Sequence, residues 1–160
     1  MIKIKKFYNC LKNINFYKAY LKGVAPLFEL TDLVQKIDNA NTLIDIGSNK
    51  GQFSLIARKF FPGIKIYSFE PQLEELNIQK KILGDHNINY YNLALGSEEK
   101  ILNLYITKRR DSSSLLEPNY QINKKEIYST SEIIKTKVKK LDNIISTNGI
   151  IRPLILKLDV

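Results

Sequence analysis

The segment from Asp45 to Phe53 combines an acid, two glycines and small polar residues where an apolar run, residues 42–46, gives way to a helical pattern. Gly47 permits a tight turn and a close approach to a ligand, and Gly51 permits the helix to begin near the strand. The helix N-terminus offers free N–H groups and a partial positive charge, which suit a carboxylate or a phosphate. We therefore expect a nucleotide-like cofactor at this turn.

The spacing of the glycines bears on which cofactor binds. Dinucleotide folds usually carry G-x-G-x-x-G, whereas here Ser48 follows Gly47, the next glycine is Gly51, and an acid stands two positions before Gly47. Glu70, at the end of the next predicted strand, can accept hydrogen bonds from both hydroxyls of an adenosine ribose, which fits either cofactor. The combination favours S-adenosylmethionine over NAD.

The elements that must position these residues follow from hydrophobic patterning. Short apolar runs such as residues 42–46 are typical of parallel strands that are buried on both faces. Pro71 ends a predicted strand, and Gly84 ends a predicted helix. The expected order is strand 42–46, helix 52–60, strand 65–70, helix 73–83 and strand 88–95. This order predicts an α/β fold with a Rossmann-like, doubly wound and mainly parallel sheet.

The pattern changes after residue 96. Residues 101–107 alternate apolar and polar side chains, as in an antiparallel or half-exposed strand. Residues 108–120 are polar and rich in serine, which predicts a loop. The remaining expected elements are a strand at 135–139, a short helix at 141–145 and a core strand of the parallel sheet at 154–160.

The N-terminal segment is basic, with six lysines before the first acid, Glu29. Apolar residues between Ile4 and Ile14 fall at helical spacing, so we expect a basic amphipathic helix. Packing of its apolar face on the domain is favoured over a weak peripheral contact of residues 1–22 with an anionic membrane. Pro26 can open a second helix that ends near residue 38.

Composition bounds the class of protein. With 160 residues, of which 44% are hydrophobic, the chain can build one domain with a real core. We expect residues 1–41 to form the basic helical segment, and residues 42–160 the cofactor-binding domain. No apolar run approaches the ~20 residues of a membrane span, and the lysine-rich start does not resemble a secretory signal. The expected location is the cytoplasm.

Metal and nucleic-acid binding are disfavoured. Cys10 is the only cysteine and His86 the only histidine, so the usual four-ligand zinc site is excluded and no metal site is assigned. The net charge of +9 suggests an anionic partner, but the basic residues form no recognisable nucleic-acid module.

Several stretches in a fixed order carry a resemblance. They are Leu43 to Phe53, Phe69 to Pro71, Asn92 to Gly96, Ser112 to Leu115, Val138 with Leu141 and Asp142, and Leu156 to Val160. Together they closely resemble the FkbM family of S-adenosylmethionine-dependent methyltransferases, and the ordered set is far more specific than any one motif. Known members methylate hydroxyl groups on sugars or polyketide-like molecules, so the resemblance implies O-methylation of a sugar, a glycan or a small metabolite.

The resemblance also implies which residues hold the cofactor. It assigns a loop around the methionine and ribose, an acid on the ribose, a segment beside the adenine and a residue of the family's serine loop. These are Asp45, Gly47, Ser48, Asn49, Gly51, Gln52 and Phe53 in the loop, Glu70 on the ribose, Asn92, Leu93 and Ala94 by the adenine, and Ser113. Asp45 has an alternative role, which is to stabilise only its own loop.

Methyl transfer chiefly requires a hydroxyl oxygen to be aligned behind the activated methyl group. A base must also take the hydroxyl proton late in the reaction. Asp159 is the best-placed carboxylate, since the resemblance puts it at the end of the strand that borders the reaction pocket. It is the candidate catalytic residue, and ligand spacing does not support a divalent metal beside it.

The chain departs from the family pattern at two places. Gln72 stands where a second proline is common, and the usual continuation after Val160, a glycine-containing helix and further strands, is absent. In methyltransferases of this class the strand at 154–160 lies inside the sheet. We therefore expect a C-terminally truncated fold with an exposed apolar edge.

Two other functions stay open at this point. One is an inactive remnant that at most binds the cofactor. The other is an NAD-dependent oxidoreductase, which the glycine spacing disfavours.

Overall fold

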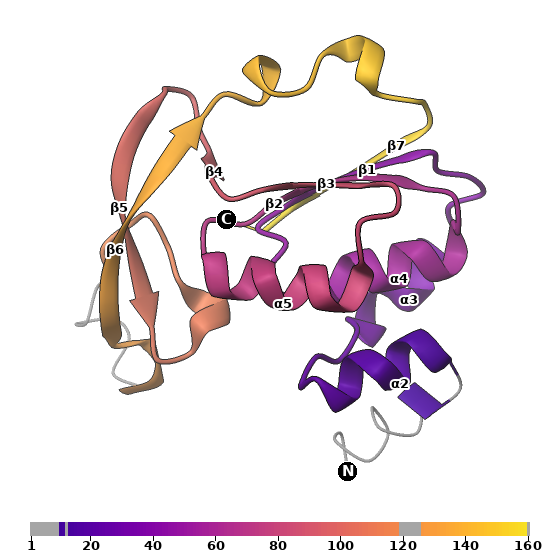
Figure 1. The fold of residues 1–160 in the computed structure, drawn as a ribbon, viewed down its shortest axis with the longest axis horizontal. Coiled ribbons are helices and arrows are strands. Elements are labelled where there is room, and N and C mark those ends of the chain that lie inside the picture. The colour runs from indigo at the N-terminus through magenta and orange to yellow at the C-terminus, as the bar shows by residue number, and fades with distance from the viewer. Residues whose placement is uncertain (1–9, 12, 119–125, 160) are drawn as a thin grey trace.

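The computed structural model describes residues 10–11, 13–118 and 126–159. Its centre is a parallel four-stranded sheet with the order β3-β2-β1-β7 (Figure 1). The strands are β1 (Thr42–Ile46), β2 (Lys65–Phe69), β3 (Ile88–Tyr91) and β7 (Leu154–Leu158). The predicted α/β fold with a mainly parallel sheet is confirmed.

The two longest helices of the described chain connect these strands. They are α4 (Gln52–Phe60), between β1 and β2, and α5 (Leu73–Leu83), between β2 and β3, and both have the predicted bounds. Both lie on the same face of the sheet (Figure 1). The first turn of α5 is acidic and its last turn is basic, which complements the helix dipole, and Gly84 ends it with a positive φ of 66°.

Short 3-10 helices cover part of the other face. Leu141 and Ile145, from η4 (Leu141–Asn143) and the residues after it, pack against the apolar side chains of β1 and β2. η5 (Thr147–Gly149) follows and leads to β7. The predicted short helix near residues 141–145 is therefore present, although it is a single 3-10 turn.

The strand order of the parallel sheet has a switch point between β1 and β7. β2 and β3 are added on one side of β1, whereas β7 pairs with the opposite side of β1 and Asp45 stands beside Lys157 in that register. Ligands of open α/β sheets bind at the carboxyl ends of the strands at such a switch point. The fold therefore opens a crevice next to the segment from Asp45 to Phe53.

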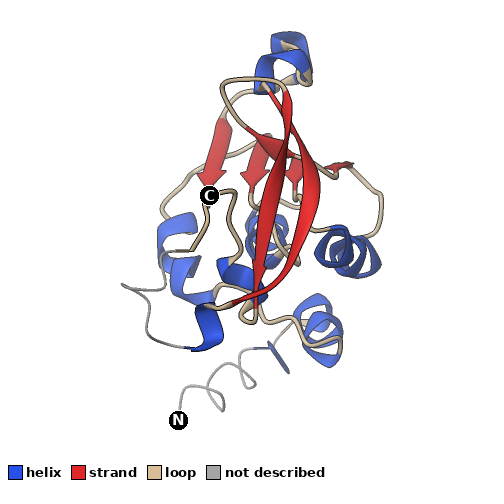
Figure 2. Ribbon diagram, turned by 90° about the vertical axis from the view of Figure 1, so that its left-hand side faces the viewer, coloured by secondary structure: helices blue, strands red, loops and turns tan. Residues whose placement is uncertain are grey.

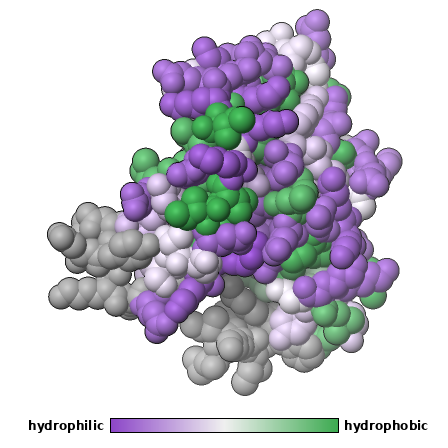
Figure 3. Space-filling view, turned by 60° about the vertical axis from the view of Figure 1, so that its left-hand side comes forward, coloured by the Kyte–Doolittle hydropathy of each residue, from purple (hydrophilic) through white to green (hydrophobic). Residues whose placement is uncertain are grey.

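A second, three-stranded sheet stands beside the first. It has the order β4-β6-β5, with β4 (Ala94–Leu95), β5 (Lys100–Thr107) and β6 (Thr130–Lys139). The antiparallel pair of β5 and β6, which we call the arm, is a long twisted ribbon (Figures 1 and 2). With the arm side forward, the surface is mainly hydrophilic with apolar patches between (Figure 3).

The prediction of a single strand at 88–95 is wrong. β3 pairs with β2, whereas β4 pairs with β6 of the other sheet. Between them, the Asn92 side-chain amide donates hydrogen bonds to the carbonyl oxygens of Glu70 and Pro71, 3.0 and 2.9 Å away. These bonds tie the chain to the end of β2 at the point where it leaves the parallel sheet. β6 is also longer than the predicted strand at 135–139, because its first half pairs with the arm strand β5.

The N-terminal elements pack on the helical face. α2 (Ile14–Leu21) is capped by Asn13, whose side-chain oxygen accepts hydrogen bonds from the N–H groups of Asn15 and Phe16. Residues 1–9 of the predicted basic helix lie outside the described residues. The helix expected after Pro26 is shorter and less regular than predicted: η1 (Phe28–Leu30) is followed directly by the four-residue α3 (Thr31–Val34).

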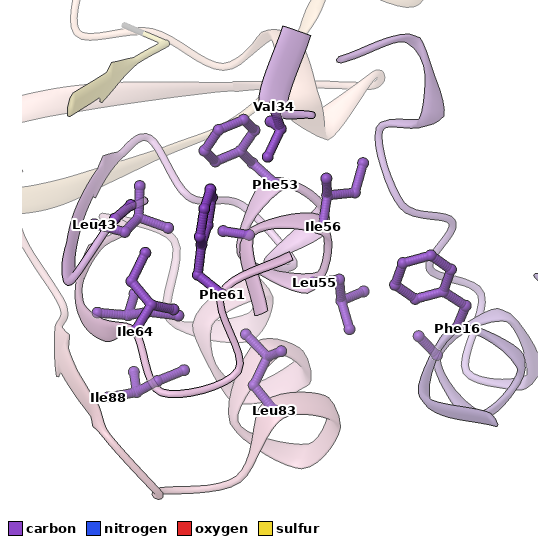
Figure 4. Packing of buried hydrophobic residues seen from close by; sticks show 14 of the residues in the cluster. Phe16, Val34, Leu43, Phe53, Leu55, Ile56, Phe61, Ile64, Leu83 and Ile88 are labelled. Atoms are coloured by element: carbon purple, nitrogen blue, oxygen red, sulfur yellow. The ribbon is translucent and has the colours of Figure 1, made fainter. Parts of the chain in front are cut away.

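The larger apolar core lies between the sheet and these helices. Phe16 of α2 lies beside Leu55 of α4, and Val34 of α3 lies near Phe53 and Ile56 (Figure 4). The N-terminal helices thus extend the core of the domain. Among residues 10–11, 13–118 and 126–159, no helix has the length and hydrophobicity needed to span a bilayer.

Asp45 and Lys157 form an ion pair inside the sheet. The Lys157 Nζ lies 3.2 Å from Asp45 Oδ1, and the two side chains are 13% and 0% exposed. Replacing Lys157 with Met leaves a buried carboxylate without its cation, which typically costs about 3–5 kcal/mol of unfolding free energy. We expect a loss of that size in urea denaturation, and a loss below about 1 kcal/mol for Lys135→Met on the exposed part of β6. Equal losses in the two variants would contradict this prediction.

Candidate functional site

A cavity of about 710 Å³ lies at the carboxyl ends of β1, β2 and β7. Its walls come from the turn after β1, the residues after β2, the strands β4 and β5, and residues 109–116. Cavities of this size accept cofactors and small ligands. Most residues that the sequence singles out line it. They are Gly47, Ser48, Asn49, Gln52, Phe53, Glu70, Leu93, Ala94, Ser113 and Asp159.

The turn after β1 passes very close to β7. A Cβ atom on Gly47 would lie 1.9 Å from the carbonyl oxygen of Asp159, and Gly47 has a φ of +67°. The N–H groups of Gly47 and Ser48 both donate to the carbonyl oxygen of Phe69, at 3.0 Å. Position 47 therefore requires glycine for two reasons: the positive φ of the turn and the close approach of the Asp159 backbone.

Gly51 serves a different contact from the one expected. A Cβ atom at this position would lie 2.7 Å from Cγ of Gln79 and 2.9 Å from Cδ1 of Leu83, both on α5. The glycine therefore brings α4 close to α5, whereas the sequence suggested closeness to the strand. Gly51 does not line the cavity.

The Glu70 carboxylate ties two turns together at the cavity wall. Glu70 is 3% exposed, its Oε2 accepts the N–H of Asn49 at 2.7 Å, and its Oε1 accepts the N–H of Gln72 at 2.8 Å. Burial raises the pKa of Glu70 to about 7, while these two hydrogen bonds oppose the shift. Each carboxylate oxygen retains a second lone pair, so both can accept another hydrogen bond.

Asp45 lies beneath the turn and does not line the cavity. Ser54 donates a hydrogen bond to its Oδ2 at 2.7 Å, and Lys157 lies beside its Oδ1. Burial raises the pKa of Asp45, whereas Lys157 and Ser54 lower it. The described contacts of Asp45 hold the loop, which is the alternative role that the sequence left open.

Asn92 also stands behind the cavity wall. Its amide bonds the end of β2, and the next two residues, Leu93 and Ala94, line the cavity instead. Of the three residues predicted beside an adenine, Asn92 supports the cavity wall, and Leu93 and Ala94 line the cavity.

Lys157 joins the turn to Asp159. Its Nζ donates to the carbonyl oxygen of Gly47 at 2.6 Å and lies 3.5 Å from Asp159 Oδ2. The Asp159 side chain is 77% exposed and borders the cavity. No group of three or more potential metal ligands occurs in the part of the chain that the structure describes.

Sequence reasoning missed several lining residues. Lys157, Gln72, Arg109 and Arg110 line the cavity, as do leucines from β4, β5 and residues 115–116. Lys157 had a usable signal, because it is the one charged residue within the strand Leu154–Leu158. The leucines of β5 had none, because the topology of the second sheet brings them to the cavity.

One family model and two solved structures are similar to this chain. Residues 45–160 match the family model described as the methyltransferase FkbM domain. A solved S-adenosylmethionine-dependent methyltransferase from Agrobacterium tumefaciens is 16% identical, with a TM-score of 0.33 over 41% of this chain and 22% of that chain. A second, described as an S-adenosylmethionine-dependent methyltransferase from Listeria monocytogenes, is 12% identical, with a TM-score of 0.35 over 72% of this chain and 78% of that chain.

The matched part of this chain thus spans about a fifth of the length of the Agrobacterium protein. None of the curated proteins matches the chain.

The turn at Gly47 gives a direct test of this geometry. Gly47→Ala forces a Cβ into the Asp159 carbonyl and requires a positive φ, so we expect the free energy of unfolding to fall by at least about 2 kcal/mol. Gly63→Ala is the matched control, because nothing lies within 4 Å of its Cβ position. Urea denaturation of both variants measures the difference, and similar losses would disprove the crowding at Gly47.

Proposed function

Because the chain belongs to the methyltransferase FkbM domain family, we propose that it binds S-adenosylmethionine in the cavity at the β1/β7 switch point and takes part in transfer of its methyl group to a hydroxyl oxygen. The observation that carries the proposal is the meeting of the Gly47 turn and the Glu70 carboxylate at one cavity. A tight turn and an acid on the neighbouring strand suit an adenosine-containing cofactor.

Glu70 is the proposed ribose ligand. Its carboxylate is buried at the cavity wall, where its two N–H donors fix its orientation and leave a lone pair on each oxygen. Two neighbouring ribose hydroxyls can donate to these oxygens in charge-assisted hydrogen bonds. The donor and acceptor groups of the site therefore fit a nucleoside.

The remaining walls supply complementary surfaces. Phe69, Pro71, Leu93 and Ala94 give an apolar surface for the adenine ring. Lys157 and Asp159 present opposite charges on the side of the Gly47 turn. The positive charge of Lys157 complements the carboxylate of the methionine portion, which leaves Asp159 to face the acceptor.

The sulfonium supplies an activated methyl group, and the chain supplies alignment and a proton acceptor. We assign Asp159 as the base. As the C–O bond would form and the S–C bond would break, the hydroxyl proton would pass to the Asp159 carboxylate. The products would be S-adenosylhomocysteine and a methyl ether. The exposure of Asp159 allows the proton to pass on to water. Alignment of the oxygen is the larger contribution, up to about 7–11 kcal/mol.

The acceptor side favours a small metabolite with an apolar part. The wall that includes the arm carries Leu95, Leu102, Leu104 and Leu115. Burial of polar hydroxyls against such leucines costs free energy unless each one finds a hydrogen-bond partner. A sugar or glycan acceptor would therefore extend towards the polar residues Arg109, Asp111 and Ser112.

The remnant that binds the cofactor without turnover is the second candidate. The NAD-dependent oxidoreductase is the third and stays disfavoured by the glycine spacing.

Isothermal titration calorimetry tests the proposal. S-adenosylmethionine and S-adenosylhomocysteine should bind, and NAD should not compete. Glu70→Ala should weaken cofactor binding by about 1–3 kcal/mol, because charge-assisted hydrogen bonds to the ribose are lost. Glu98→Ala, at an exposed acid, is the control and should leave the affinity unchanged. Failure of the wild-type chain to bind either ligand would refute the proposal, whereas binding with no methyl transfer to hydroxyl acceptors would support the remnant.

The pH dependence of binding gives a second test. A ribose hydroxyl donates to the ionised carboxylate, so binding favours the deprotonated form of Glu70, whose pKa is about 7. Affinity should therefore rise with pH and level off above 7, with a decrease of about tenfold from pH 8 to pH 6. Titrations in buffers of different ionisation enthalpy should show proton release near pH 7. Glu70→Gln should bind with a flat profile over this range, and a profile as steep as that of the wild type would exclude Glu70 as the source.

A further inference from the structure

Glu75 is a buried carboxylate that the proposed chemistry does not use. It lies in the first turn of α5, and its side chain is 2% exposed. Two cations from different loops reach it: Arg110 Nε lies 2.6 Å from its Oε1, and Lys50 Nζ lies 3.6 Å from its Oε2. Burial of a carboxylate is costly without such partners, so its position calls for a reason.

The two cations belong to two walls of the cavity. Lys50 lies in the turn between β1 and α4, whose residues Gly47 to Asn49 line the cavity. Arg110 lies in residues 107–116, which we call the serine loop, and most of this loop lines the cavity as well. One side chain of α5 therefore contacts both.

The serine loop is fastened to α5 around Arg110. The Arg110 carbonyl oxygen accepts hydrogen bonds from Gln72 Nε2 at 3.0 Å and from Ser113 Oγ at 2.9 Å. A second ion pair joins Arg110 Nη2 to Glu74 Oε2 at 3.0 Å. Arg110 thus fastens the loop to α5 through both its main chain and its side chain, while backbone hydrogen bonds of Ser114 to Tyr105 and of Lys108 to Ser129 hold it to β5 and to the residue before β6.

The two acids that hold Arg110 differ most in burial, and Glu75 also pairs with Lys50. The Glu74 side chain is 77% exposed, whereas that of Glu75 is 2% exposed, and they are neighbours on the same helix. Exposed ion pairs contribute little, because water screens them and the side chains lose entropy. The loss of one partner from a buried pair has a large effect. Of the two acids, the buried one therefore contributes more to holding Arg110 and its loop.

We propose that Glu75 is a positioning residue that shapes the cofactor cavity by holding the serine loop through Arg110 and the β1 turn through Lys50. The fastening of the loop follows from the contacts alone, while its effect on cofactor affinity rests on the proposed function.

Trypsin provides a local probe, because Lys108, Arg109 and Arg110 give three adjacent cleavage sites in the serine loop. Glu75→Gln keeps the shape of the side chain and all three sites but removes the charge. We expect cleavage at these sites to be at least about fivefold faster than in the wild type, and to slow at saturating S-adenosylhomocysteine. Glu74→Gln is the matched control and should stay within about twofold of the wild type.

The affinity for S-adenosylhomocysteine, from calorimetry, gives the second measurement. Glu75→Gln should raise the Kd about tenfold, and Glu74→Gln should leave it within about twofold. Arg110→Gln should match Glu75→Gln in cleavage after Lys108. The double variant should be no faster than either single variant, because the two residues act through one contact.

Three results would overturn the proposal. One is equal cleavage rates in Glu74→Gln and Glu75→Gln. The second is faster cleavage of Glu75→Gln throughout the chain, which would make the role one of general stability. The third is a fully additive double variant. A wild-type chain that binds no S-adenosylhomocysteine would instead refute the proposed function, and the cleavage rates without ligand would still decide the role of Glu75.

Discussion

Where β1 and β7 end side by side, the backbone leaves no room for a side chain at position 47. The Asp159 N–H donates to the carbonyl oxygen of Ile46 at 3.1 Å, and the Asp159 carbonyl occupies the place that a Cβ of Gly47 would take. Lys157 then reaches back to the Gly47 carbonyl and to Asp45. A backbone hydrogen bond, the close approach of Asp159 and the side chain of Lys157 thereby fix the turn. Because the turn lines the cavity, its position determines where the other walls must lie to enclose a ligand.

Buried acids organise the cavity around this turn. Asp45 ties β1 to β7, Glu70 ties the turn after β1 to the turn after β2, and Glu75 ties α5 to two loops. A buried carboxylate is tolerated only when donors surround it, so each acid specifies where its partners must lie. The cavity is thus held by contacts between segments that lie far apart in the sequence. At Glu70 the two N–H donors lower the pKa of the carboxyl group, but burial raises it by more, so the pKa lies above its ordinary value.

The second sheet contributes apolar side chains to the cavity. The chain leaves the parallel sheet after β3, and β4 pairs with β6, so that Leu95 and the leucines of β5 line the same cavity as the Gly47 turn. The parallel sheet therefore contributes the Gly47 turn, Glu70 and Lys157 to the cavity, and the arm contributes leucines. This division suits a cofactor held by polar contacts next to an acceptor that is held partly by apolar ones.

The sequence by itself determined the parallel strands, the bounds of α4 and α5, and the two acids and the glycine at the ends of β1 and β2, because these features depend on local patterning and backbone geometry. It failed where partners are distant. The break between β3 and β4, the support role of Asn92 and the places of Lys157 and Glu75 depend on which segments meet in space. Only the tertiary structure decided these, since a carboxylate on an amphipathic helix looks the same in sequence whether water or an arginine from a distant loop surrounds it.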